Sequence, residues 1–582
     1  MREVVTMSKP FERSRLKKRY TYMAIGSYVL VVLFFCHWGY LKGNNPDISS
    51  ASLALEAIDH MLTNPLQFLP VDLQYPFYGL LLGLIAPLMF QTEYLRRRDL
   101  RPSVESGSAK WNENIKAYNK TYVDIPRQGS GSKNMIMTKD IFLSMDTRKT
   151  LRNNNVIVIG GSGSGKSFRL VKPNLLQANS SFVVTDPSGE LLESMGDFLE
   201  QEGYEIRVFN LIDMAHSDTY NPFRYIRNQE GVLIMLNALI KNTNPTGSKP
   251  NDPFWEKAET ALLEAICFYV LEQPQELHNF STVMQLLRLA EAPEGGTSVL
   301  DAMFEDFSQS HPNHIAVTSY AVYKSAGGGK TAQSILISCQ TRLHTFNLDA
   351  IKKLTNTDSI DLGTIGDKKV ALFCITPTAD TTFNYLVSMM YTQLFETLYH
   401  HAETECEGKR LKYHVRFLLD EFANIGTIPD FCQRLATMRK YEISCTIILQ
   451  ALSQIKALYK DEWDVLIANC DSFLFLGASD NTTLEYISKS LGKETIRTTN
   501  NSRSFGKSGG SSISYNKTGR ELMTPDELRT MNNENCIFFL RGLDPFFSRK
   551  YSLKDHPNYQ RCSNGGGKPY IVKEKKNTDD WS

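Results

Sequence analysis

Short apolar runs separated by helical patterns dominate the chain after about residue 100. The runs are rich in valine, isoleucine, leucine and phenylalanine and are bounded by polar residues. Runs of this length are typical of strands buried on both faces, and their alternation with helices predicts an α/β fold with a largely parallel sheet. The predicted strands are residues 156–159, 182–184, 206–209, 370–375, 415–419, 445–449, 472–476 and 537–540.

Three stretches depart from this alternation. Residues 223–325 lack such runs and repeat apolar residues at helical spacing, so we expect an all-helical insert there. Residues 497–519 are rich in glycine, serine and asparagine, carry four basic residues and no acidic one, and predict a mobile loop. Residues 561–582 are mostly polar and predict a C-terminal tail.

Two apolar runs near the N-terminus predict membrane-spanning helices, which make residues 1–100 a membrane anchor. Residues 20–41 contain no Asp, Glu, Lys or Arg and extend roughly 33 Å as a helix, enough to cross a bilayer. Residues 75–90 extend roughly 24 Å, so the second span is expected to include flanking residues, at about 73–92. The length of the first run and the lack of a small-residue cleavage site exclude a cleaved signal peptide. A buried hairpin of a soluble protein is the alternative.

Basic residues flank the two runs unevenly. The segment before the first run and the segment after the second are rich in Arg and Lys, whereas the connecting loop has Lys42 as its only Lys or Arg. Because cytoplasmic segments carry the excess of basic residues, both termini are predicted to be cytoplasmic. The body of the chain would then lie in the cytoplasm beside the membrane.

Composition narrows the function classes without choosing among them. The 582 residues are too many for one core and predict two to four domains. The formal net charge of +1 excludes a uniformly basic, histone-like DNA-binding protein, although a basic channel is compatible with it. The 10 cysteines include no C-x-x-C pair, so the sequence predicts reduced thiols with neither a zinc site nor a disulfide framework.

A glycine-rich loop follows the first predicted strand. Residues 160–167, GGSGSGKS, match the pattern G-x-x-x-x-G-K-[ST] between a strand and a helix. Glycines let successive N–H groups point at phosphate oxygens, while Lys166 is predicted to reach the β- and γ-phosphates and Ser167 to bind Mg²⁺. The loop therefore predicts an ATP site, against the alternative of a chance glycine-rich turn. Its candidate residues are Gly160, Gly161, Ser162, Gly163, Ser164, Gly165, Lys166 and Ser167.

A second glycine-rich segment, residues 327–331 (GGGKT), resembles the end of such a loop. We reject it as a nucleotide site because Lys324, rather than a glycine, stands six residues before Lys330. The residues before it do not form an apolar strand pattern either. A turn at the start of a helix is expected instead.

Polar side chains end three of the predicted strands. Asp420 is predicted to bind Mg²⁺ as a direct or outer-sphere ligand, and Glu421 to orient or deprotonate the attacking water. Gln450 follows the strand at 445–449, at the end where open α/β sheets bind ligands, and is predicted to sense the γ-phosphate or position water. A satisfied turn residue is the alternative for Gln450. For Asp186, after the strand at 182–184, a turn role is favoured.

These motifs, in this order, resemble the TraG/TraD-type coupling proteins of bacterial conjugation and type IV secretion, membrane-anchored relatives of the FtsK/HerA translocases. The resemblance covers about residues 100–555. Besides the two apolar runs and GGSGSGKS, it rests on DPSGEL (186–191), SDTYNPF (217–223), DPFWEKAE (252–259), GGGKTAQSI, LLDEFANIG (418–426), IILQALSQI (447–455) and RELMTPDELR (520–529).

The resemblance implies a RecA-like P-loop NTPase domain, residues 101–222 and 326–560, interrupted by the all-α domain at 223–325. It implies an ATPase of the bacterial cell membrane, hexameric when active, that takes relaxase-bound single-stranded DNA and delivers it to the type IV secretion channel. Arg439 lies where the family places an arginine finger that acts on the neighbouring subunit. Two residues depart from the family pattern, since Ser188 replaces a frequent lysine and Glu442 a frequent glycine.

The sequence leaves three functions open. The first is a motor that moves DNA by ATP hydrolysis, with the basic segment 497–519 as a candidate strand contact, for which a solvated linker is the alternative. The second is a platform that recruits relaxase or effector proteins while ATP sets its conformation. The third is a receptor for secreted protein effectors with the same ATPase and no DNA role. The joint presence of the candidate site residues favours hydrolysis, but the sequence does not separate DNA cargo from protein cargo.

Overall fold

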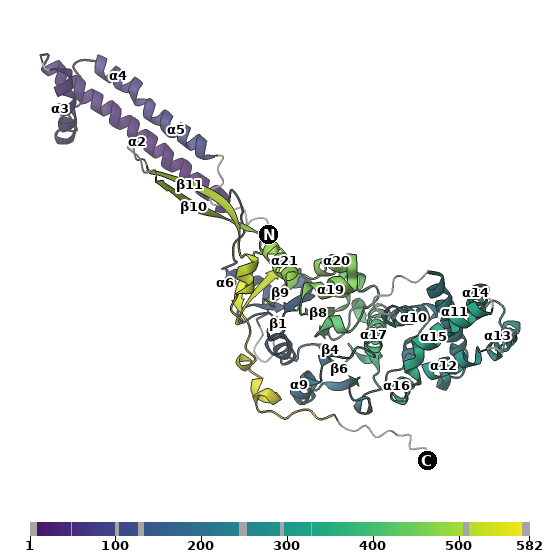
Figure 1. The fold of residues 1–582 in the computed structure, drawn as a ribbon. Helices are drawn as coiled ribbons and strands as arrows, with labels where there is room; N and C mark the ends of the chain where they lie inside the picture. Colours follow the sequence, from purple (N-terminus) through teal and green to yellow (C-terminus); the bar gives the residue numbers. More distant parts are fainter. Residues whose placement is uncertain are drawn as a thin grey trace. The chain divides into compact units, whose positions relative to one another are not determined.

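The structure is a computed structural model, drawn as a ribbon in Figure 1. It describes residues 8–47, 49–98, 104–125, 133–243, 253–291, 296–327, 329–503 and 511–572. The chain divides into two compact units. The first comprises Met1–Ser108 and Lys493–Arg520, and the second comprises Ala109–Gly492 and Glu521–Ser582.

Helices at the N-terminus of the first unit include two segments long and apolar enough to cross a membrane, Lys18–Asn44 and Gln74–Glu93. They coincide with the predicted spans, and their helices run side by side (Figure 1). Gly79 allows the close approach, because a Cβ there would lie 2.7 Å from the Cβ of Phe35. The helices of this part are α2 (Ser8–Asn44), α3 (Ser50–Thr63), α4 (Gln74–Gly83) and α5 (Ile85–Arg98).

The first unit also contains a two-stranded sheet formed by β10 (Lys493–Arg503) and β11 (Ser511–Glu521). The prediction of a loop at 497–519 was wrong over these strands. The prediction relied on the many glycines and serines of this segment and gave too little weight to the threonines and isoleucines of the two strands, which favour extended backbone. Residues 504–510, within the predicted loop, lie outside the described residues.

A nine-stranded sheet forms the centre of the second unit, in the order β13-β12-β9-β3-β8-β7-β4-β6-β5. Strands from β9 to β5 pair in parallel, whereas β12 pairs antiparallel with both β9 and β13. Every predicted strand is present. The strands are β3 (Val156–Gly160), β4 (Ser181–Pro187), β5 (Glu205–Asn210), β6 (Val370–Thr376), β7 (Val415–Leu419), β8 (Ile443–Leu449), β9 (Ser472–Gly477), β12 (Asn535–Leu540) and β13 (Phe546–Arg549).

Three strands of the second unit were not predicted. One is β13, and the others are β1 (Asn134–Ile136) and β2 (Phe142–Ser144), which form a separate antiparallel pair. All three are only three or four residues long. Runs this short carry too little periodicity for a sequence pattern to reveal them.

Both faces of the sheet are buried, which explains the continuous apolar runs. In β3, Ile157 and Ile159 belong to one hydrophobic core and Val156 and Val158 to the other. Helices cover both faces. The helices of the second unit outside the helical segment described next are α6 (Ile115–Tyr122), α7 (Thr147–Thr150), α8 (Lys172–Leu175), α9 (Glu190–Gln201), α17 (Asn384–Thr404), α18 (Phe431–Thr437), α19 (Leu452–Tyr459), α20 (Trp463–Ala468), α21 (Asn481–Leu491) and α22 (Pro525–Arg529).

The described residues between β5 and β6 form no strand and build a helical group beside the sheet (Figure 1). The group continues past residue 325, because α15 and α16 pack against α11 and α12. Lys330 is the first residue of α15, so the GGGKT segment leads into a helix, as expected. The helices are α10 (Gln229–Thr243), α11 (Pro253–Leu271), α12 (Phe280–Leu289), α13 (Val299–Ser310), α14 (Ile315–Ser325), α15 (Lys330–Leu343) and α16 (Asp349–Thr355).

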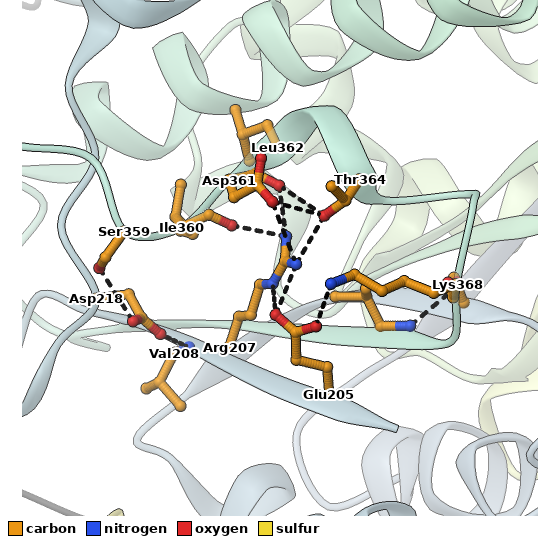
Figure 2. A network of polar contacts seen from close by, with 12 residues as sticks. Glu205, Arg207, Val208, Asp218, Ser359, Ile360, Asp361, Leu362, Thr364 and Lys368 are labelled. Carbon is orange, nitrogen blue, oxygen red and sulfur yellow. Dashed lines mark hydrogen bonds and ion pairs between the residues drawn. The ribbon is translucent and has the colours of Figure 1, made fainter. Parts of the chain in front are cut away.

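The two connections between the sheet and this helical group form a neck, residues 217–225 and 354–364. The N–H groups of Ser359 and Ile360 donate to Thr219 O at 3.0 and 3.1 Å. Arg207 of β5, with its side chain buried, donates to Ile360 O at 2.8 Å and to Thr364 Oγ1 at 2.7 Å (Figure 2). These bonds tie both ends of the helical group to the edge strand.

Candidate nucleotide-binding site

The glycine-rich loop, residues 160–167, connects β3 to a short π-helical turn, Ser167–Val171, that continues into α8. Gly163 and Gly165 have φ angles of 73° and 85°, which side chains rarely permit. A Cβ on Gly160 would lie 2.3 Å from Ser164 Oγ, so the loop closes tightly at its start. The sequence prediction of a strand, a glycine turn and a helix in succession is confirmed.

Two polar side chains of the loop, Lys166 and Ser164, differ in how they are paired. The Lys166 amine donates to the carbonyl oxygens of Gly160 at 2.9 Å and Gly161 at 3.4 Å. The hydroxyl of Ser164 is buried without a hydrogen-bond partner in the structure. Buried polar atoms are normally paired, so this atom indicates a missing partner. The loop therefore fits an anionic, phosphate-bearing ligand.

Asp420 follows β7 and accepts a hydrogen bond from Ser167, the last residue of the glycine-rich loop. Ser167 Oγ donates to Asp420 Oδ2 at 2.5 Å. The Asp420 side chain is 3% exposed, and burial raises the pKa of its carboxyl. A hydroxyl and a buried carboxylate side by side are the oxygen donors that Mg²⁺ prefers at phosphate sites.

Glu421 is held between two amide groups. Gln450 Nε2 donates to Glu421 Oε1 at 3.3 Å, and Asn424 Nδ2 donates to Glu421 Oε2 at 3.1 Å. The backbone of Glu421 has φ 50° and ψ 47°, a left-handed conformation that turns the chain directly after β7. The structure brings together Glu421 and Gln450, as predicted for one site. Asn424 was missed, although its spacing of three residues from Glu421 was visible in the sequence.

Strand order explains why these residues meet. The strand β8 lies between β3, which leads into the glycine-rich loop, and β7, which leads into Asp420 and Glu421. All three strands are parallel, so their carboxyl ends lie at one edge of the sheet. Gln450 follows β8 and is therefore placed between the loop and the carboxylates.

Lys550 contacts the main chain of the glycine-rich loop, and this contact was not predicted from the sequence. It follows β13, its side chain is 3% exposed, and its amine donates to Ser164 O at 2.9 Å and to Asn533 Oδ1 at 3.0 Å. Burial lowers the pKa of Lys550 to about 8. A single lysine near the C-terminal end of the chain carries no local pattern that would have revealed this contact.

Asp186 is the penultimate residue of β4, near the same edge of the sheet. Its carboxylate is fully buried and accepts from the N–H groups of Leu191 at 3.1 Å and Leu192 at 2.8 Å, at the start of α9. Burial raises the pKa of Asp186 to about 7. The contacts make Asp186 a helix-capping residue, in keeping with the turn role favoured from the sequence.

Within one chain, Arg439 lies far from the residues of the candidate nucleotide site. It precedes β8, whereas Gln450 follows β8, and a seven-residue strand spans about 23 Å. Its guanidinium donates to Thr147 O at 2.7 Å. Glu442, three residues later, has a φ of 64°, the conformation for which a glycine is best suited. The site in one chain is thus assembled without Arg439.

The sequence of the chain is similar to the sequences of known proteins. The sequence model of the family Type IV secretory system Conjugative DNA transfer matches residues 110–572. The conjugal transfer protein TraG of Rhizobium radiobacter is 24% identical over 397 residues, covering 67% of this chain and 60% of TraG. Protein VirD4 of Rhizobium radiobacter is 22% identical over 414 residues, covering 68% of this chain and 56% of VirD4. The chain thus matches less than two thirds of the length of either relative.

Solved structures share the fold. The plasmid coupling protein TrwB in complex with the non-hydrolysable ATP analogue ADPNP aligns with a TM-score of 0.56 and 16% identity, over 78% of this chain and 96% of that chain. TrwB in complex with ADP and Mg²⁺ aligns with a TM-score of 0.55 and 16% identity, over 78% and 95%. The predicted α/β fold of the RecA-like P-loop type is confirmed.

Proposed function

The chain belongs to the Type IV secretory system Conjugative DNA transfer family, and from this premise we propose that it is a membrane-anchored coupling ATPase. It receives single-stranded DNA bound to a relaxase, presents it to a type IV secretion channel, and drives its transfer by ATP hydrolysis. The bond between Ser167 and Asp420 beside the glycine-rich loop carries this proposal, because it pairs a phosphate loop with a metal-binding carboxylate.

ATP with Mg²⁺, when bound, supplies the phosphoryl group whose hydrolysis drives transfer. The N–H groups of the loop and the amine of Lys166 would bind the phosphates, Lys166 in place of its carbonyl partners Gly160 and Gly161. Ser167 and Asp420 would hold Mg²⁺. Glu421 orients the attacking water and accepts its proton, while Gln450 and Asn424 keep the Glu421 carboxylate aimed.

Lys550 acts as a positioning residue for the same site. Its amine bonds the main chain of Ser164, so it holds the loop in the shape that directs N–H groups at phosphate. Its positive charge also lies beside the loop and adds to the attraction for a polyanionic ligand.

The first unit is proposed to hold the protein in the bacterial cell membrane. Its two apolar segments, Lys18–Asn44 and Gln74–Glu93, are long enough to span, and the basic residues on either side favour cytoplasmic termini. Residues 101–222 and 326–560 form the proposed NTPase domain, with residues 223–325 as the all-α domain and residues 561–582 as the tail. The packing of α15 and α16 on α11 and α12 supports moving the all-α boundary to Thr355.

Assembly into a hexamer completes the proposal. Arg439 lies at the sheet edge opposite its own nucleotide site, so a role in hydrolysis requires it to reach the site of a neighbouring subunit. In a ring, each subunit would then respond to the nucleotide of the next.

The deciding experiment is ATP turnover of the detergent-purified full-length protein, with and without single-stranded DNA, beside the Glu421→Gln variant. Turnover that DNA stimulates and that the variant loses supports the DNA motor. DNA binding without any turnover, in the presence of Mg²⁺, contradicts the motor and favours the recruiting platform. Turnover that responds to an effector protein and not to DNA favours the protein-secretion receptor.

A further inference from the structure

A cluster of metal-ligand side chains lies at the amino-terminal edge of the sheet. It consists of Asp367, before β6, His401, in the last turn of α17, and Cys406, just after this helix. One ligand atom of each residue lies within 4.8 Å of those of the other two. Asp367 Oδ1 is 2.8 Å from His401 Nε2. We call these three residues the Asp–His–Cys cluster.

Main-chain hydrogen bonds hold the cluster together. The N–H groups of Glu405 and Cys406 both donate to His401 O, at 3.0 and 3.2 Å, which fixes the backbone at the end of α17. Asp367 lies in a turn closed by its own N–H, which donates to Thr364 O at 3.2 Å. The ligand atoms therefore meet because the backbone places them, although 34 residues separate Asp367 from His401.

A fourth residue orients the imidazole. Glu405 Oε2 is 3.1 Å from His401 Nδ1. When Nδ1 carries the proton and donates it to this carboxylate as a hydrogen bond, Nε2 is left with its lone pair directed at Asp367, the arrangement that outer carboxylates impose on metal-binding histidines. The side chain of His401 is 14% exposed and that of Asp367 is 44% exposed, so an ion reaches the cluster from solvent.

The charges of the cluster favour a cation. Within the described residues, each ion pair recorded for Asp367 or Glu405 is with His401, so two carboxylates share one imidazole. Arg227 also interacts electrostatically with Glu405, so the excess of negative charge is present while the imidazole is neutral. A divalent cation neutralises this charge better than one proton does.

We propose that the Asp–His–Cys cluster binds Zn²⁺, with water as the fourth ligand. Sulfur, imidazole nitrogen and carboxylate oxygen together are a donor set that zinc accepts in tetrahedral geometry. On binding, the thiol of Cys406 loses its proton to solvent, as does Nε2 of any His401 that carries one, and the contact between His401 Nε2 and Asp367 Oδ1 is replaced by two metal–ligand bonds.

The zinc site is separate from the nucleotide site. Asp367 precedes β6, whereas the glycine-rich loop follows β3, and both strands belong to the parallel part of the sheet. The two sites therefore lie at opposite edges. Zinc here would cross-link the end of α17 to the turn before β6 and would take no part in hydrolysis.

Cobalt substitution tests the proposal in the detergent-solubilised full-length protein after treatment with a chelator. One equivalent of Co²⁺ is expected to produce a sulfur-to-cobalt charge-transfer band and the intense visible bands of tetrahedral cobalt, and Zn²⁺ is expected to abolish both. Cys406→Ser should remove the charge-transfer band. His401→Gln and Asp367→Asn should each weaken Co²⁺ binding by about tenfold or more, and Glu405→Gln by about tenfold.

The matched control is Cys470→Ser, because Cys470 is another partly buried free thiol, whose sulfur bonds only to Leu466 O among the recorded contacts. This variant should keep the full spectrum. The thermal transition of each variant verifies its folding. Because the Glu405 side chain is exposed, Glu405→Gln changes the cluster without altering the hydrophobic core. A wild-type protein without the bands, or bands that persist in Cys406→Ser, overturns the proposal.

Discussion

Ser167 and Asp420 are joined by a 2.5 Å hydrogen bond, although 253 residues separate them in the chain. The hydroxyl comes from the end of the glycine-rich loop and the carboxylate from the end of β7. Because Asp420 is buried and this bond is short, the two oxygens are already placed for a shared ligand. The structure thus prearranges the proposed Mg²⁺ site.

Replacing the loop lysine tests the phosphate site. Lys166→Ala is expected to reduce ATP turnover to background, because the variant lacks the cation that compensates phosphate charge in the transition state. Turnover with Mg²⁺ is measured by phosphate release. The matched control is Lys330→Ala, which alters the GGGKT lookalike at the exposed start of α15 and should leave turnover unchanged. Equal losses in both variants would contradict the assignment of Lys166.

Removing the charge of Glu421 separates binding from hydrolysis. Glu421→Gln is expected to bind ATP with nearly unchanged affinity and to hydrolyse it at least about 100-fold more slowly, the usual contribution of a general base. Gln450→Ala should slow turnover less, because Asn424 still holds the carboxylate. Single-turnover rates and nucleotide binding are measured side by side, with the exposed Glu276→Gln as the control. Normal hydrolysis in Glu421→Gln would show that another group activates water.

The buried Lys550, which contacts the glycine-rich loop, predicts that the KM for ATP depends on pH. The pKa of Lys550 is about 8, so its charge is present below pH 8 and is lost as the pH rises through this value. The KM for ATP should therefore increase above pH 8. Lys550→Met should raise KM about fivefold at pH 7, the equivalent of one lost hydrogen bond, and abolish the increase above pH 8.

Two comparisons make the Lys550 prediction specific. A positioning role predicts that KM changes more than kcat, whereas a general loss of folding lowers the active fraction and hence the apparent kcat. Lys554→Met removes an exposed lysine four residues away and should keep the wild-type profile. An unchanged pH profile of KM in Lys550→Met would refute the proposed support of the loop.

The neck predicts a stability effect far from the nucleotide site. Arg207→Met leaves the carbonyl oxygen of Ile360 and the hydroxyl of Thr364 without their buried donor, so the free energy of unfolding should fall by about 3 kcal/mol. Urea unfolding in detergent measures the change. Arg224→Met, which alters an exposed arginine of the neck, should change stability by less than about 0.5 kcal/mol. Equal stability of both variants would show that the network in Figure 2 contributes little.

The membrane anchor is tested by truncation. A variant lacking residues 1–100 should be recovered in the soluble fraction, because both segments able to span a membrane are removed. The full-length chain should resist extraction by alkaline carbonate, which releases peripheral proteins. A truncated chain that still resists this extraction would contradict the assignment.

Local patterns in the sequence determined the central strands and the glycine-rich loop. Each of these features can be recognised from consecutive residues: an apolar run such as 156–159 must be buried on both faces, and the glycines of GGSGSGKS permit the turns of the loop. The carboxylates after β7 and the amide after β8 were found for the same reason, since each directly follows a strand. Local patterns failed where composition was ambiguous, as in β10 and β11.

Only the tertiary structure decided which of these residues meet. Insertion of β8 between β3 and β7 places Gln450 against Glu421, and the antiparallel edge strand β13 brings Lys550 beneath Ser164. The end of α17 likewise folds Cys406 toward His401 and Asp367, where the cysteine spacing alone had predicted no zinc site. Strand order and helix-end turns depend on packing summed over the whole core, so residues hundreds of positions apart carry no local signal of their contact.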